Sequence, residues 1–194
     1  LGGLAFTPVI FFTLAILFGI NQYLNFPELA ADYSSNINVL AMALCSMTLL
    51  YLVGIADDLI GVRYRAKFVI QIISGILLVG AGVWVHGLYG FCGIHNFNIW
   101  FGGALTIVLI VFITNAINLI DGIDGLASGL SGAACFYYGI VFFKLHQYTF
   151  ALISFVTLGV IVPFFLYNVF GKAENQKKIF MGDTGALTIG IILS

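Results

Sequence analysis

The sequence predicts an all-α fold, a polytopic transmembrane helical bundle with about seven spans. The first observation is composition: of 194 residues, 61% are hydrophobic and 8% are charged, whereas a soluble domain carries roughly 25% charged residues. The second is that apolar runs of helix-spanning length, about 20 residues, recur along the chain. Nucleic acid is not an expected partner, because no basic face is present to follow phosphates.

Six complete apolar runs and one partial run are expected to form the spans. The complete runs cover approximately residues 2–20, 37–56, 68–85, 99–117, 127–143 and 149–168. The seventh begins near residue 184. Pro163 lies inside the sixth run, where neighbouring helices tolerate a kink. The first residue is Leu1 and the last, Ser194, falls within an apolar run, so we expect a single transmembrane domain over 1–194 that is truncated at both ends.

The basic residues are distributed unevenly over the segments between the runs. Six of the seven lie in segments 57–67 and 169–183, and none lies in segment 21–36. They are Arg63, Arg65, Lys67, Lys172, Lys177 and Lys178. If the helices alternate in direction, both segments and segment 118–126 share one side. Because positively charged loops stay in the cytoplasm, we expect this side to be the cytoplasmic face of the inner (plasma) membrane.

The same alternation places five aspartates on the cytoplasmic side, at the ends of spanning helices. They are Asp57, Asp58, Asp121, Asp124 and Asp183. An aspartate at the centre of a spanning helix costs roughly 2.5–3.5 kcal/mol on insertion scales, and less near the interface. Acids grouped without equal numbers of nearby bases indicate a bound divalent cation, so we expect a functional site here.

The first acidic motif is the Asp57-Asp58 pair in "GIADDLIGVRYRAKFVIQ", residues 54–71. Neighbouring side chains on a helix point about 100° apart, so the two carboxylates can serve different partners. One would accept a proton or orient a nucleophile, while the other faces a cation. The alternative is a pair of solvated loop acids flanked by arginines.

The second motif is "TNAINLIDGIDGLASG", residues 114–129. Asn115, Asn118 and Asp121 recur every three residues, so neighbouring members can lie on one stripe of a helix. The glycines that follow permit the chain to unwind and approach a ligand. Amide and carboxylate oxygens are hard ligands suited to Mg²⁺ or Mn²⁺. The alternative is a polar helix cap followed by a glycine-rich turn.

The third motif is "FMGDTGALTIG", residues 180–190, in which Asp183 lies where a helix begins. Aspartate is a common N-cap, and this alternative explains the residue on its own. Helix N-termini also favour phosphate oxygens. The functional interpretation gains strength because all three motifs are expected on one face.

These motifs identify a resemblance to the polyprenyl-phosphate N-acetylhexosamine-1-phosphate transferases, which are membrane glycosyltransferases of family 4. The features that carry it are Asp57-Asp58 followed by Lys67 and Gln71, then "NAINLIDGIDGLASG", then "MGDTGA". Their order and separations are similar to those of the family over essentially the whole chain. The Asn-Ala-x-Asn pattern looks more like the UDP-GlcNAc branch than the phospho-N-acetylmuramoyl-pentapeptide transferase branch, which is the alternative.

The resemblance implies an enzyme with a defined reaction. Polyprenyl (undecaprenyl) phosphate attacks the β-phosphorus of a UDP-N-acetylhexosamine and releases UMP, with Mg²⁺ or Mn²⁺ as cofactor. This reaction is the first membrane step in making envelope polymers such as peptidoglycan, lipopolysaccharide O-antigen or teichoic acid. The implied partners are the lipid phosphate and the UDP-sugar, and a homodimer is compatible with this interpretation.

The resemblance also implies residue roles. Asn118 and Asp183 would be metal ligands, with Asn115 beside them in substrate binding. Asp57 or Asp58 would deprotonate or orient the lipid phosphate, and the motif does not choose between them.

The remaining motif residues are assigned to the substrates. The family pattern implies that Asp121 and Asp124 position the nucleotide-sugar or support the metal shell. Lys67, with Arg63 and Arg65, would offset substrate charge.

Two interpretations of other classes compete with the enzyme. A cation-coupled transporter would also place acids in a membrane protein, but it predicts carboxylates near the bilayer midplane with access from both sides. A scaffolding membrane protein leaves the five aspartates unexplained. The end-of-helix placement on one side favours chemistry at the interface.

Overall fold

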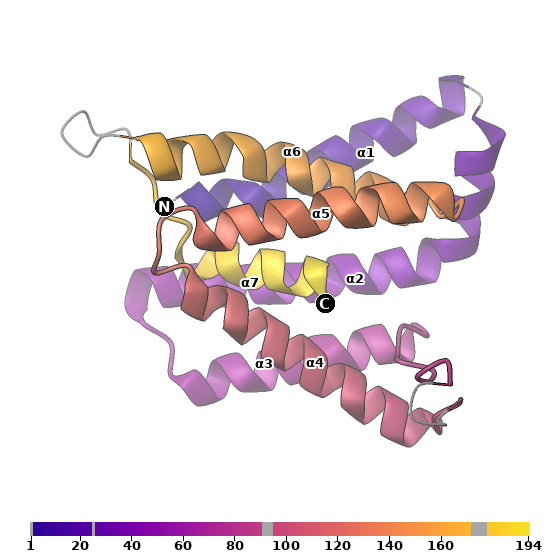
Figure 1. Cartoon of the computed structure of the whole chain (residues 1–194), viewed down its shortest axis with the longest axis horizontal. Coiled ribbons are helices and arrows are strands. Elements are labelled where there is room, and N and C mark those ends of the chain that lie inside the picture. The colour runs from indigo at the N-terminus through magenta and orange to yellow at the C-terminus, as the bar shows by residue number, and fades with distance from the viewer. Residues whose placement is uncertain (1, 25, 91–94, 172–177) are drawn as a thin grey trace.

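The computed structural model describes residues 2–24, 26–90, 95–171 and 178–194. Within these ranges the chain is helical and contains no strand. A short 3₁₀ helix, η1, precedes seven α-helices (Figure 1). Their bounds are η1 Gly2–Ala5, α1 Phe6–Leu24, α2 Pro27–Ile60, α3 Tyr64–Gly80, α4 Ile99–Ile120, α5 Leu126–Lys144, α6 Tyr148–Phe170 and α7 Gly182–Leu193.

The predicted all-α membrane bundle is confirmed. Every predicted apolar run corresponds to a helix, and five segments are long and apolar enough to cross a membrane: 2–21, α2, α4, α5 and α6. The other two are shorter, with 17 residues in α3 and 12 in α7. Large apolar side chains such as Phe12 and Phe112 point outward, as expected of a surface that faces lipid.

Two predicted boundaries were wrong. Segment 21–36 was expected to be a connection, but α2 begins at Pro27 and runs for 34 residues, roughly 50 Å at the rise of a helix. Proline is well suited to the first helical turn, where its missing N–H has no partner to lose. Figure 1 shows that the first turns of α2 cross the end of the bundle before the helix runs back along it.

The second error concerns the run predicted over 68–85. Helix α3 ends at Gly80, and the chain leaves it through a turn in which Gly82 has φ +96°. This left-handed conformation suits glycine and ends a right-handed helix. Residues 81–85 are therefore part of the apolar run but not of the helix.

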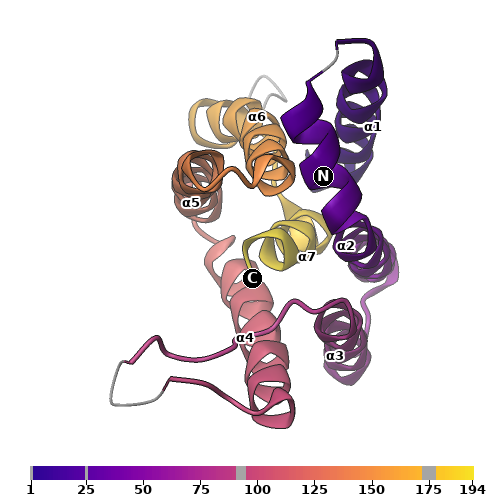
Figure 2. The same ribbon diagram turned by 90° about the vertical axis from the view of Figure 1, so that its right-hand side faces the viewer.

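Helix α7 lies at the centre of the bundle, surrounded by the other helices (Figure 2). Eight of its 12 residues are buried. It packs closely against α2 and α4 because glycines face it or belong to it: a Cβ on Gly54 would lie 2.5 Å from Thr184 Cα, and one on Gly190 would lie 2.6 Å from Thr114 Cα. Backbones approach this closely only where a side chain is absent.

One end of the bundle collects the three motifs. Helices α2, α4 and α6 finish at this end, and α3, α5 and α7 begin there (Figure 1). The alternation of helix direction inferred from the sequence therefore holds for the described helices. The polar residues at these helix ends form the site.

Candidate active site

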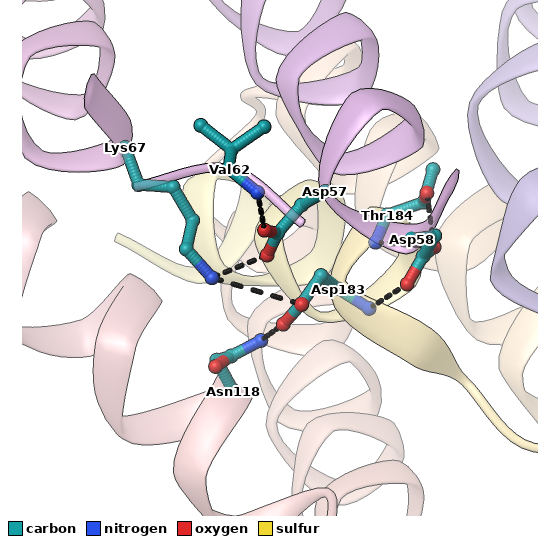
Figure 3. Close-up of polar contacts among 7 residues, drawn as sticks. All are labelled: Asp57, Asp58, Val62, Lys67, Asn118, Asp183 and Thr184. Atoms are coloured by element: carbon teal, nitrogen blue, oxygen red, sulfur yellow. Dashed lines mark hydrogen bonds and ion pairs between the residues drawn. The ribbon is translucent and has the colours of Figure 1, made fainter. Parts of the chain in front are cut away.

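Asp57 and Lys67 face each other across a short turn between α2 and α3. Gly61, with φ +70°, ends α2 and reverses the chain. The backbone N–H of Val62 donates to Asp57 Oδ1 at 2.6 Å, which fixes the carboxylate against the turn. Lys67 lies one turn into α3, and its ammonium group donates to Asp57 Oδ2 (Figure 3).

Lys67 also approaches Asp183 from the first turn of α7. The distance from Lys67 Nζ to Asp183 Oδ2 is 3.6 Å. One ammonium group thus lies between two carboxylates from different helices. The side chain of Asp57 is only 6% exposed, so the attraction is screened less than it would be on an open surface.

Asp58 has a different set of partners from its neighbour. Its carboxylate accepts the backbone N–H of Asp183 at 2.9 Å and that of Thr184 at 3.1 Å. The Thr184 hydroxyl donates to Asp58 Oδ2 at 2.5 Å. Asp58 therefore satisfies the free N–H groups at the start of α7, the task of an N-cap, although it belongs to another helix. The two adjacent carboxylates face different partners.

Asn118 and Asp183 meet where α4 ends and α7 begins. The Asn118 side-chain amide donates to Asp183 Oδ1. The oxygen and nitrogen of an amide are assigned from such contacts, and a rotation of the amide by half a turn would present its oxygen beside the same carboxylate. The two residues thus offer a carboxylate and an amide oxygen on one side of the cluster.

The described residues include no group of three or more His, Cys, Asp or Glu arranged to hold a metal ion. Mg²⁺ in phosphate chemistry is usually bound by one or two carboxylates together with waters and substrate phosphates. The Asn118–Asp183 pair fits a metal ion shared with a phosphate, and it does not fit a closed site made by protein alone.

Asp121 directly follows α4 and is half-buried near the start of α7. Burial raises the pKa of Asp121 to about 6, and repulsion from Asp183, Asp124 and Asp58 adds to the effect, while a hydrogen bond from the backbone of Gly182 opposes it. Like charges and desolvation both favour the protonated acid. The described acids are thus close enough to repel one another.

Asp124 lies further out and is exposed. Lys178 Nζ donates to Asp124 Oδ2 at 2.6 Å. Lys178 was counted among the basic residues of segment 169–183 without a specific role, and the structure places it beside the second motif. Lys172 and Lys177 of the same segment lie outside the described residues.

Asn115 lies one turn deeper than Asn118 and does not contact Asp183. Its amide nitrogen donates to Gln71 Oε1 and to the carbonyl oxygen of Val111, both at 2.7 Å. Asn115 instead lines an apolar groove of about 650 Å³ between α3 and α4, with Phe68, Ile72, Val111 and Leu119 among its other lining residues. Phe68 follows Lys67 in α3 and Leu119 follows Asn118 in α4, so one end of the groove lies near the charged cluster.

Arg63 and Arg65 are exposed and lie outside the cluster. Neither forms an ion pair within the described part of the chain. Arg65 Nε donates to the Tyr64 hydroxyl at 3.1 Å, and the guanidinium group lies 5.7 Å from the centre of that ring. These arginines therefore add positive charge to this end of the protein without direct contact with the carboxylates.

Two side chains at this end were not singled out from the sequence. Thr184 belongs to the third motif and donates to Asp58. Asn168 in α6 contacts the chain beside both Asp124 and Lys178. The sequence does show Asn168 as an amide near the end of an apolar helix. It does not show which groups the amide contacts, because these are distant along the chain.

Comparison with known families identifies one that matches most of the chain. The family described as "Glycosyl transferase family 4" matches residues 40–194. This range contains all three motifs.

Curated relatives of two kinds are similar to the chain. "Phospho-N-acetylmuramoyl-pentapeptide-transferase" of Rubrobacter xylanophilus is 32% identical over 91% of this chain and 48% of the relative. The protein with the same description from Enterococcus hirae is 36% identical over 73% of this chain and 46% of the relative. "Undecaprenyl-phosphate alpha-N-acetylglucosaminyl 1-phosphate transferase" of Yersinia pestis is 34% identical over 73% of this chain and 39% of the relative. The chain spans about half the length, or less, of these relatives.

Proposed function

The chain belongs to glycosyl transferase family 4, and from this premise we propose that the protein transfers N-acetylhexosamine 1-phosphate from a UDP-sugar to polyprenyl phosphate. The reaction releases UMP and leaves a lipid-linked diphosphosugar. We further propose that Mg²⁺ or Mn²⁺ is required. The observation that carries the proposal is that Asp57, Lys67, Asn118 and Asp183 converge at one end of an apolar bundle.

The arrangement suits a reaction between two anionic substrates. A phosphate nucleophile and a diphosphate electrophile repel each other, so their approach requires positive charge. Lys67 supplies one such charge between Asp57 and Asp183. A divalent ion held by Asn118 and Asp183 would neutralise the diphosphate and the departing UMP when bound.

The partners of the two adjacent aspartates favour a division of roles. Both oxygens of Asp58 accept hydrogen bonds from the start of α7, so we assign Asp58 to holding Asp183 in place. Asp57 accepts instead from the Val62 N–H of the turn and from Lys67, the ammonium group that we assign to the substrates. We therefore assign to Asp57 the task of accepting a proton from the lipid phosphate or orienting its oxygen.

The apolar groove between α3 and α4 gives the lipid a path to this carboxylate. Its lining is apolar except for Asn115, as expected for a surface that packs against an isoprenoid chain. Phe68 in the groove and Lys67 in the cluster are neighbours on α3. A chain lying in the groove would present its phosphate to Lys67 and Asp57.

We propose that the site faces the cytoplasm and that the sugar is N-acetylglucosamine. Arg63, Arg65, Lys67 and Lys178 all lie at the site end, which supports the orientation by the positive-inside rule. The Asn-Ala-x-Asn pattern around Asn118 supports the sugar. Relatives described as phospho-N-acetylmuramoyl-pentapeptide transferases make that donor the alternative.

A direct test uses membranes that contain the full-length protein, polyprenyl phosphate, Mg²⁺ and either radiolabelled UDP-GlcNAc or labelled UDP-N-acetylmuramoyl-pentapeptide. We expect label to enter the lipid fraction from UDP-GlcNAc with equal release of UMP, and a chelator to stop both. Transfer from the pentapeptide donor alone would contradict N-acetylglucosamine as the sugar and favour the muramoyl-pentapeptide donor. Proton or sodium flux without a labelled lipid would contradict the transferase activity and favour a cation-coupled transporter.

A further inference from the structure

Asn168 connects two segments of the site end that are far apart in sequence. It lies near the end of α6, and its residue is only 5% exposed. Its side-chain oxygen accepts the backbone N–H of Gly125 at 2.6 Å, and its side-chain nitrogen donates to the carbonyl oxygen of Ile179 at 2.9 Å. The oxygen and the nitrogen of the amide are therefore both hydrogen-bonded to backbone groups.

The two bonded backbone groups are neighbours of charged residues in the site. Gly125 directly follows Asp124, and Ile179 directly follows Lys178. We propose that Asn168 is a positioning residue that holds the loop carrying Asp121 and Asp124 against the segment leading to Asp183. It acts through these two backbone contacts.

The packing of Gly125 supports this role. Its φ of +77° is left-handed, and a Cβ at this position would lie 2.5 Å from Val169 Cγ2 and 3.3 Å from Phe165 Cε2. The loop therefore lies directly on α6, where its N–H reaches Asn168. A bulkier residue would lift the loop from the helix and break the hydrogen bond.

The second link between the two segments is the ion pair of Asp124 and Lys178. Both side chains are partly solvated, and ion pairs in water contribute little to holding a geometry. The Asn168 side chain is buried and its two hydrogen bonds are partly buried, where an unpaired backbone group is costly. The relative position of the two segments therefore depends on the amide more than on the ion pair.

The expected consequence for catalysis rests on the proposed function. If Asp121 and Asp124 position the nucleotide-sugar, displacement of their loop weakens binding of that substrate. The groove that receives the lipid lies between α3 and α4, away from α6. Loss of Asn168 should therefore raise the KM for the UDP-sugar and leave the KM for polyprenyl phosphate unchanged.

Two substitutions in the full-length protein test the role. Asn168→Leu removes both hydrogen bonds at similar volume and should raise the KM for the UDP-sugar about tenfold, the effect expected for a lost buried hydrogen bond. The control is Thr157→Val in the same helix, which removes a buried hydroxyl that bonds only within α6. The control should leave both KM values unchanged.

Asn168→Asp gives a readout that a purely structural residue would not show. A neutral carboxyl group can accept from Gly125 and donate to Ile179, whereas its ionised form repels the Ile179 carbonyl. Burial favours the neutral form. The activity of this variant relative to wild type should therefore recover as the pH falls, and that of Asn168→Leu should not.

Hydrogen exchange separates this inference from the proposed function. Asn168→Leu should speed amide exchange in residues 121–126 and 178–182, and Thr157→Val should not. Unchanged exchange, equal rises in both KM values, or faster exchange with an unchanged KM in an active enzyme would each overturn the positioning role. If Asn168→Leu speeds exchange but the wild-type protein shows no transfer, the proposed function is overturned. The structural role of Asn168 is then still supported.

Discussion

The two ends of the bundle both carry acids, but they use them differently. At the end opposite the site, Asp32 Oδ2 accepts the backbone N–H of Thr149 at 2.6 Å, and Glu28 accepts the Tyr148 hydroxyl at 2.7 Å. Each of these carboxylates has its own neutral donor on α6. At the site end, carboxylates from different helices approach one another and share Lys67.

The comparison shows that an acid at a helix end does not by itself indicate a site. Asp32 and Glu28 join α2 to α6, and their charges are dispersed. At the site end burial raises the pKa of Asp121, and repulsion from Asp183, Asp124 and Asp58 raises it further. Such a cluster is stable when a cation or a substrate counter-charge joins it, and this property distinguishes the site end from the opposite end.

The largest predicted effect separates the two ends directly. Asp57→Asn should lower kcat by about 10²–10⁴-fold, the usual contribution of a group that accepts a proton in the transition state. Asp32→Asn should change kcat by less than about twofold, because it lies far from the reaction. Initial rates of UMP release from membranes measure both. Equal losses in the two variants would contradict the contrast between the ends.

The second prediction concerns charge inside and outside the cluster. Lys67→Met keeps the apolar stem and removes the ammonium group, and it should lower kcat/KM by roughly 10²–10³-fold, as for loss of one preorganised electrostatic contact. Arg65→Met removes an exposed charge that contacts Tyr64, and its effect should be within about fivefold. A loss for Arg65→Met as large as that for Lys67→Met would place the arginine in the site.

The third prediction compares two carboxylates that accept backbone N–H groups. Asp58→Ala and Asp32→Ala should each destabilise the protein by about 0.5–2 kcal/mol, the usual cost of a lost cap. Only Asp58→Ala should also reduce activity, because it releases the start of α7 and with it Asp183. Thermal unfolding in detergent and transfer rates at a temperature where both variants are folded test this. Full activity of Asp58→Ala would show that α7 keeps its position without the cap.

The smallest effect is expected in the apolar groove between α3 and α4, the proposed lipid path. Ala116→Phe would fill part of the space between α3 and α4 and raise the KM for long-chain polyprenyl phosphate about three- to tenfold, the scale of one or two buried methylene contacts. The KM for the UDP-sugar should be unchanged. Gly159→Phe fills a separate apolar groove between α1 and α6 and is the matched control. Equal effects of the two substitutions would argue against the α3–α4 groove as the lipid path.

Much of the fold could be predicted because a bilayer leaves few alternatives to helices of about 20 apolar residues. Charged residues were displaced to helix ends, so the alternation of direction brought Asp57, Asp58, Asp121 and Asp183 to one end. Hydropathy did not show that α2 extends back to Pro27, because those turns cross the end of the bundle and carry polar residues.

The finer structure of the site was not accessible from the sequence. Asn115 and Asn118 were expected to lie beside each other. Three residues leave an offset of about 60° around the helix and about 4.5 Å along it, and the deeper amide donates to Gln71 instead. Asn168 was missed because its partners are 43 and 11 residues away along the chain. Such contacts depend on how helices pack and leave no local pattern.

The close contact of Gly54 with Thr184 has a mechanical consequence. It lies one turn before Asp57 and sets one main chain directly on another, leaving no rotatable groups between them that could adjust. The start of α7, and with it Asp183, is therefore held at a fixed height along α2. If the proposed lipid phosphate is the substrate, its phosphate must reach the carboxylate at that height, so we expect reactivity to depend on how deep the headgroup lies in the leaflet.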